Sequence, residues 1–249
     1  LLRAALAVVM IACLFPVGQS CCLSIRHEKQ QRQLQKLKTN SSGIKPLESR
    51  GREQEGRRST GLQSLFRENH DLVGWITIEG TKIDYPVMQC DDDTYYLSHN
   101  FRKEEDKYGC LYVKSIADVG TPGTNIIIYG HNMKDGSMFG ELDRYESETF
   151  GREHQSIIFD TLYEEREYQV MAVFQTQISE DETGRFQYYQ FYEARTKEEF
   201  REFYEHVKDR SIYDTGVTAA FGDTFLTLST CSGYAENGRL VVVARRMEK

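Results

Sequence analysis

Short apolar runs, rich in β-branched and aromatic residues, recur along residues 62–249 with polar loops between them. Such runs predict strands, and we expect them over residues 73–78, 82–88, 110–113, 125–129, 157–162, 168–175, 225–231 and 240–243. Helical spacing is confined to residues 62–70, 138–150 and 196–209, the last with Thr196 as an N-terminal cap. So many short strands with so few helices predict a mainly β chain, closed into a barrel with helical insertions.

Charge divides the chain of 249 residues into a basic leader and an acidic globular part. Residues 24–60 hold ten Lys or Arg and four Glu, whereas residues 61–249 hold twenty basic and thirty-four acidic side chains. Nucleic-acid binding needs clustered Lys and Arg against the phosphates, so the acidic part is not expected to bind nucleic acid. It favours a cationic partner, such as a free amine.

The first 61 residues predict a segment that attaches the globular part to a membrane. Residues 4–23 are mostly apolar, and about 20 such residues span a bilayer, so we interpret residues 1–23 as an anchor. A cleaved signal peptide and a lipobox ending at Cys21 are alternatives, and all three place the rest of the chain outside the cytoplasm. The basic flank argues against this orientation, because positive charge normally stays inside.

Three expected segments follow from this division. Residues 1–23 are the anchor or signal segment, residues 24–61 are a charged helix followed by a flexible linker, and residues 62–249 are the globular domain. The helix is expected over residues 24–38, which are highly charged and lack Gly and Pro.

Three chemically reactive side chains stand at the ends of predicted strands. Cys231 ends one strand and is followed by a polar loop, Arg239 opens the next strand, and His131 comes directly after a third. Loops on a rigid scaffold are where catalytic groups gather, and a thiol, an imidazole and a guanidinium together suit acyl transfer through a cysteine. The alternatives are a buried core thiol, a structural histidine and a surface arginine.

These residues carry a resemblance to a known family. Residues 227–231, Thr-Leu-Ser-Thr-Cys, resemble the T-L-x-T-C signature of sortases, residues 238–242 resemble their arginine strand, and Tyr129-Gly130-His131 resembles their histidine site. The class B branch is indicated by residues 73–76, 83–87 and 95–99 and by the long helix-bearing insert before the cysteine strand. The resemblance spans roughly residues 62–246.

The resemblance implies a fold and an activity. The fold would be a closed, eight-stranded sortase barrel with an N-terminal helix and a helix before the cysteine strand. The activity would be that of a cysteine transpeptidase outside a Gram-positive-type cell, which cleaves a C-terminal sorting signal of the LPXTG or NPQTN kind after its threonine. The acyl group would pass through a thioester to an amine of the cell-wall precursor or of a pilin.

The family's roles pass to matching positions of this chain. Cys231 would be the nucleophile, His131 the proton donor and acceptor, and Arg239 the cation that stabilises the oxyanion together with the backbone N–H of Ser232. Asn132 is a candidate for orienting the imidazole. The residues expected to line the peptide groove are Leu97, Tyr188, Tyr189 and Ser229.

No cofactor or metal is expected. The sequence has no C-x-x-C pair and no acidic cluster that suits calcium, although a disulfide between Cys90 and Cys110 stays open. Two other functions also stay open. One is a cysteine hydrolase of the same peptides, in which water replaces the amine, and the other is a non-catalytic surface module that holds peptides in the barrel groove.

Overall fold

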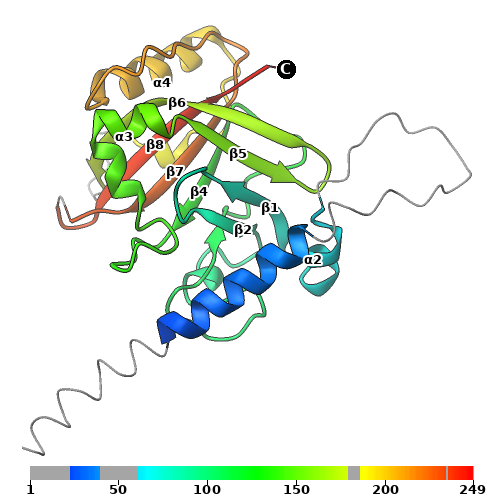
Figure 1. The fold of residues 1–249 in the computed structure, drawn as a ribbon. Coiled ribbons are helices and arrows are strands. Elements are labelled where there is room, and N and C mark those ends of the chain that lie inside the picture. Colours follow the sequence, from blue (N-terminus) through cyan, green and yellow to red (C-terminus); the bar gives the residue numbers. More distant parts are fainter. Residues whose placement is uncertain (1–22, 40–60, 179–185, 234, 249) are drawn as a thin grey trace, which may run out of the picture.

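Eight strands close into a barrel in the computed structural model, which describes residues 23–39, 61–178, 186–233 and 235–248 (Figure 1). The strands are β1 (Leu72–Thr77), β2 (Asp84–Met88), β3 (Leu111–Tyr112), β4 (Asn125–Gly130), β5 (Ser156–Thr161), β6 (Glu165–Gln177), β7 (Phe225–Cys231) and β8 (Gly238–Arg246). Their order around the barrel is β1-β2-β3-β4-β7-β8-β6-β5. The pairs β2–β3 and β4–β7 are parallel and the others antiparallel, and the expected closed, mainly β barrel is confirmed.

Within residues 61–248, short helical segments precede the first strand or connect later strands. They are α2 (Gln63–Glu68), α3 (Glu148–Glu153), α4 (Lys197–Arg210) and the 3₁₀ turns η1 (Tyr95–Leu97), η2 (Leu142–Glu146) and η3 (Tyr188–Gln190). The single helix expected over residues 138–150 is wrong. Met138 has a positive φ of 53° and Ser147 is extended, so the segment divides into η2 and α3.

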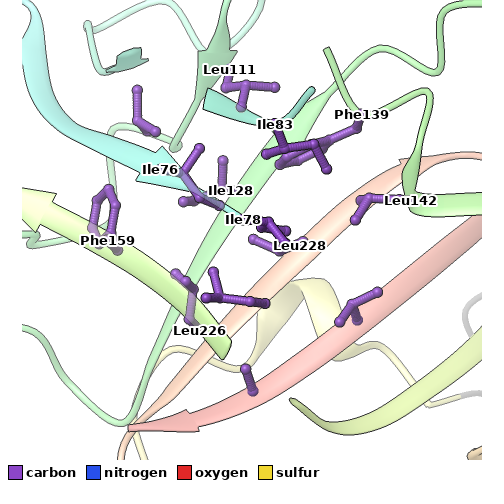
Figure 2. Close-up of a cluster of buried hydrophobic side chains, with 14 of the residues drawn as sticks. Ile76, Ile78, Ile83, Leu111, Ile128, Phe139, Leu142, Phe159, Leu226 and Leu228 are labelled. Atoms are coloured by element: carbon purple, nitrogen blue, oxygen red, sulfur yellow. The ribbon is translucent and has the colours of Figure 1, made fainter. Parts of the chain in front are cut away.

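The interior of the barrel is filled by aliphatic and aromatic side chains from facing strands (Figure 2). On β7, Leu226 and Leu228 point into this cluster, as Ile126 and Ile128 do on β4. Because side chains alternate along a strand, the residues between them face outward. This alternation fixes which strand-end residues can meet on the outer surface.

Helix α4 covers the outer face of β6, β7 and β8. Thr196 and Glu199 form a reciprocal capping box at its start, as the expected cap requires. Its buried face packs Phe200, Phe203 and Val207 into a second apolar cluster, whose strand members include Phe225, Val241 and Val243.

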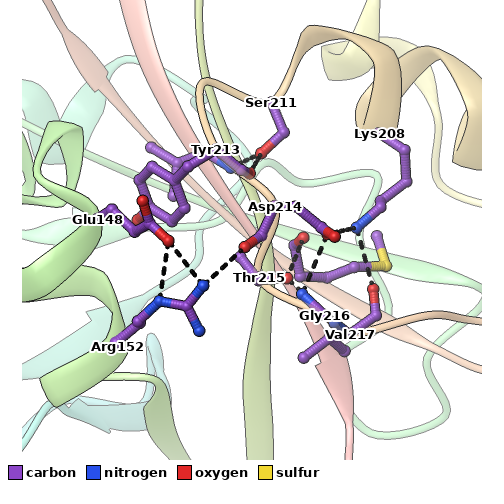
Figure 3. Close-up of polar contacts among 11 residues, drawn as sticks. Glu148, Arg152, Lys208, Ser211, Tyr213, Asp214, Thr215, Gly216 and Val217 are labelled. Atoms are coloured by element: carbon purple, nitrogen blue, oxygen red, sulfur yellow. Dashed lines mark hydrogen bonds and ion pairs between the residues drawn. The ribbon is translucent and has the colours of Figure 1, made fainter.

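Polar contacts fix the far end of α4 (Figure 3). Lys208 Nζ lies 3.0 Å from Asp214 Oδ1, and Arg152 of α3 donates to the Asp214 backbone oxygen. The segment that follows α4 is therefore attached both to the helix and to α3.

A helix over residues 23–39 packs against the barrel beside β1 and β2 (Figure 1). Its buried residues are His27, Gln31 and Leu34, and Lys38 Nζ lies 2.8 Å from Asp160 Oδ2 on β5. The helix expected over residues 24–38 is therefore present and docked. Within the described residues, no helix has the length and apolar character needed to cross a bilayer, and the expected anchor lies almost entirely outside them.

Candidate active site

The ends of β4, β7 and β8 bring His131, Cys231 and Arg239 into one row. In the parallel pair β4–β7 the last partners are Gly130 and Thr230, so the next residue on each chain is His131 and Cys231. In the antiparallel pair β7–β8, Cys231 is the partner of Arg239. Neighbouring strands lie about 4.8 Å apart, so the three backbones meet at one edge of the sheet.

The row lies on the outside of the barrel. Cys231 is two residues beyond Ser229 and four beyond Thr227, on the face of β7 opposite Leu226 and Leu228. Cys231 is exposed, whereas the six residues of β7 before it are buried. The sulfur therefore does not belong to the interior, which excludes the alternative of a core thiol.

The other two described cysteines differ from Cys231. Cys110 is buried, and burial raises the pKa of its thiol, while Cys90 is half-buried. All three described thiols are free, so the structure has no disulfide between Cys90 and Cys110.

Two hydrogen bonds position His131. Its Nε2 lies 2.7 Å from the backbone oxygen of Leu97, and its own backbone oxygen accepts from the N–H of Phe139 at 3.0 Å. A carbonyl oxygen only accepts, so Nε2 carries the proton in this contact, and Nδ1 is the nitrogen left to exchange one. The expected groove residue Leu97 thus contacts the histidine through its backbone, while its side chain is 36% exposed.

Asn132 has a different partner from the one expected. Its Nδ2 donates to both carboxylate oxygens of Asp143, at 2.8 and 3.0 Å, and to the backbone oxygen of Cys231 at 2.9 Å. Asn132 therefore joins the histidine strand to the cysteine strand, and its side-chain amide is committed to these contacts and not to the imidazole. Asp143, on η2, was missed because nothing in its local sequence distinguishes it from a surface acid.

The backbone N–H of Ser232 is already used within the sheet. It donates to the Gly238 oxygen at 2.9 Å, and Nη1 of Arg239 donates to the same oxygen at 2.9 Å. Its expected role as an oxyanion donor is therefore not supported by this geometry. The guanidinium is the cationic donor group that remains beside Cys231, and its planar fork offers several N–H groups.

Tyr188 and Ser229 form a buried layer beneath the row. The Tyr188 hydroxyl lies 2.7 Å from Ser229 Oγ, and both side chains are about 1% exposed. Burial raises the pKa of Tyr188 to about 12, so its hydroxyl stays neutral. Tyr188 and Ser229, which were expected to line the peptide groove, are thus buried beneath it and support its floor, whereas Tyr189 is half-buried.

Tyr112 is a further residue that sequence reasoning missed. It is the partner of Tyr129, two residues before His131, which places it near the row, and burial raises its pKa to about 12. Its ring stacks on that of Tyr129, with centroids 5.5 Å apart. Tyr112 lies on β3 and Tyr129 on β4, and the sequence pattern does not show that these two strands pair.

Among the described residues, no group of three or more His, Cys, Asp or Glu side chains is arranged to hold a metal ion. The chemistry of the row is that of a thiol nucleophile beside an imidazole and a fixed cation. This arrangement suits attack on a carbonyl carbon, proton exchange with a leaving or entering amine, and stabilisation of the negative charge that develops on oxygen.

Comparisons with known proteins agree with this geometry. The family model for the sortase domain matches residues 76–247. The sortase B of Listeria monocytogenes is 35% identical over 190 residues, which cover 76% of this chain and 74% of that protein. The sortase B of Staphylococcus aureus is 29% identical over 189 residues, covering 76% and 75%.

Solved structures extend the likeness to the fold. The crystal structure of sortase B from B. anthracis in complex with AAEK1 has a TM-score of 0.75 at 32% identity, covering 91% of this chain and 98% of that one. The S. aureus sortase B–substrate complex has a TM-score of 0.72 at 29% identity, covering 89% and 94%. The chain belongs to the sortase family, and it is a cysteine transpeptidase of the class B type.

Proposed function

We propose that this transpeptidase cleaves a sorting signal of the LPXTG or NPQTN kind after its threonine and transfers the protein to an amine of the cell-wall precursor or of a pilin. The observation that carries the proposal is the row of His131, Cys231 and Arg239 on one outer edge of the barrel. The globular part is acidic, with thirty-four acidic and twenty basic side chains, which favours a cationic amine as acceptor.

The first half-reaction forms a thioester. The Cys231 thiolate attacks the threonine carbonyl carbon, and the guanidinium of Arg239 stabilises the resulting oxyanion. The tetrahedral intermediate then collapses, the C–N bond breaks, and His131 gives its proton to the departing amine. The threonine acyl group remains on sulfur.

The second half-reaction releases the product. The acceptor amine attacks the thioester carbonyl, His131 takes the amine's proton, and the thiolate leaves. Thiolate and imidazolium are then regenerated together, ready for the next substrate. We assign peptide contact to the side chains of Leu97, whose backbone oxygen contacts His131, and of the half-buried Tyr189, whose ring lies 5.5 Å from that of Tyr188.

We further propose that residues 1–23 anchor the enzyme in the cell membrane and that its catalytic domain lies outside the cell. The length and apolar character of residues 4–23 support this. A domain held at the outer surface would meet secreted proteins as they emerge and the amine acceptors of the wall.

One assay tests the reaction. The purified protein is incubated with sorting-signal peptides, with and without added amines, and the products and any peptide–enzyme adduct are identified by mass spectrometry. We expect a thioester adduct on Cys231 and an amide product that needs the amine. The Cys231→Ala variant should lose both, while Cys90→Ser should keep them. Cleavage that yields only the free acid at every amine concentration would identify a hydrolase instead.

A further inference from the structure

The helix over residues 23–39 has a buried face and an opposite, solvent-facing one. His27, Gln31 and Leu34 face the barrel, with exposed fractions of 4%, 8% and 3%. Their spacing of four and three residues follows a single helix face. Gln35 Nε2 also donates to the Asp84 oxygen of β2, so the docking fixes which way the helix is turned.

The opposite face is basic. Ile25, Lys29, Arg32 and Lys36 follow the same spacing and are all exposed, and we call this set the outward stripe. Its first residue is apolar, and Ile25 and the neighbouring Leu23 are 60% and 44% exposed. A helix of 17 residues is about 25 Å long, and residues at this spacing form a row along its axis.

The charges of the stripe fit an anionic partner outside the chain. Arg32 pairs with Glu28 of the same helix, but Lys29 and Lys36 have no ion pair within the part of the chain that the structure describes. Of the five basic side chains of this helix, Arg26 and Lys38 lie outside the stripe and pair with Glu104 and Asp160 of the barrel, at 3.2 and 2.8 Å. Among the described residues, no acidic side chain of the barrel pairs with Lys29, Arg32 or Lys36, so the ion pairs of the barrel do not account for the cations of the stripe.

We propose that the outward stripe lies on the anionic phospholipid headgroups of a membrane. A straight row of cations with apolar residues at one end matches a flat surface that offers phosphates and, just below them, acyl chains. The apolar residues 4–23 lead directly into the stripe, so it begins where an anchored chain would leave the bilayer. The stripe would also explain why a basic flank follows the anchor on the outer side.

The same contact would bring the active site to the membrane. Ser24 Oγ lies 3.2 Å from Asp135 Oδ2, and the Tyr108 hydroxyl donates to the same oxygen at 2.8 Å. Asp135 lies on the loop that begins at His131. The start of the helix is therefore attached to the histidine loop, and a substrate that is itself attached to the membrane would lie close to it.

Chemical labelling of lysines tests the proposal on the full chain. The protein is added to vesicles of phosphatidylcholine alone or mixed with phosphatidylglycerol, and acetylation by a water-soluble reagent is followed by mass spectrometry. We expect Lys29 and Lys36 to react about five-fold more slowly on the mixed vesicles, which is about 1 kcal/mol for each lysine. Lys197, exposed on α4, serves as the internal control and should react equally on both.

Variants and salt make the test specific. Arg32→Gln should weaken the protection of Lys29 and Lys36, Arg201→Gln on α4 should not, and high salt should remove the protection. Equal labelling on the two lipid compositions would overturn the proposal. Equal protection by a soluble polyphosphate would overturn it as well, by assigning the stripe to a soluble polyanion.

This inference uses the proposed membrane anchor for one argument only, which is that residues 4–23 lead directly into the stripe. Flotation with phosphatidylcholine vesicles reports on the anchor alone, because those vesicles carry no net charge. A protein that fails to float with them, yet is protected by the mixed vesicles, would refute the anchor and support the stripe.

Discussion

Nε2 of His131 lies 2.7 Å from the backbone oxygen of Leu97. The partner is a main-chain atom, so the imidazole is held by the fold of η1 and not by the chemistry of a side chain. The contact also connects the histidine to a residue that we assign to the peptide groove, so substrate binding and proton transfer meet at one position.

The Leu97→Ala substitution separates these two roles. We expect KM for the sorting peptide to rise because apolar contact area is lost, while kcat stays within about two-fold because the backbone oxygen remains. Steady-state kinetics with a fluorogenic peptide measures both constants. A fall in kcat as large as that of His131→Ala would show that the side chain itself positions the ring.

The amide of Asn132 links Asp143 to the Cys231 carbonyl, and its loss should loosen the end of β7. We expect Asn132→Ala and Asp143→Asn each to lower kcat on the order of ten-fold, equivalent to about 1.4 kcal/mol, with little change in KM. Asp209→Asn, on the exposed surface of α4, is the matched control. Unchanged kcat in both variants would show that Asn132 and Asp143 do not position Cys231.

Arg239→Lys keeps the charge but removes the planar fork beside Cys231. We expect kcat/KM to fall about 100-fold or more, because a lysine ammonium cannot reproduce the geometry of the oxyanion contact. Thioester formation in a single turnover locates the loss in the first half-reaction. Near-normal turnover would contradict the oxyanion role, and Arg201→Lys on α4 controls for the substitution itself.

Gly130 precedes His131 where neighbouring side chains leave no room. A Cβ at this position would meet Leu111 and Phe139, so Gly130→Ala should shift the end of β4. We expect a loss of about 1–3 kcal/mol in the free energy of unfolding, together with reduced activity. Urea denaturation measures the loss, and Gly233→Ala, where a Cβ has open space, should change stability little. Equal stability of the two variants would contradict the packing argument.

The docked helix should make stability depend on pH through His27. Burial lowers the pKa of this imidazole, which Asp106 and Asp135 only partly oppose, and its ring stacks on Tyr108 with centroids 4.1 Å apart. The unfolded chain therefore binds the proton more readily. We expect the stability contributed by His27 to be complete above about pH 7 and to fall as the pH drops through the unfolded pKa of about 6.5.

The comparison variant for this prediction is His27→Phe, which retains an aromatic ring beside Tyr108 but does not titrate. Urea midpoints between about pH 5 and 8 should decline more steeply with acid in the unmodified protein than in the variant. If the urea midpoints of the two proteins changed equally with pH, protonation of His27 would have no effect on stability.

Local signals in the sequence determined most of the elements. The alternation in residues 225–231 gave β7 its interior and exterior faces, and the Thr196–Glu199 box set the start of α4. Each signal depends only on residues close together in the sequence, so it can be recognised without knowledge of the tertiary structure. The expected helix over residues 138–150 failed because backbone conformation at Met138 and Ser147, not side-chain spacing, divides it.

The tertiary structure decided which atoms meet. Asn132 and the Cys231 carbonyl are 99 residues apart, and only the parallel register of β4 and β7 brings them to 2.9 Å. The antiparallel register of β7 and β8 commits the Ser232 N–H to Gly238 and leaves Arg239 beside the sulfur. A sequence motif specifies which functional groups are present, whereas strand order and pleat fix their direction, because pairing between distant segments depends on the whole barrel closing.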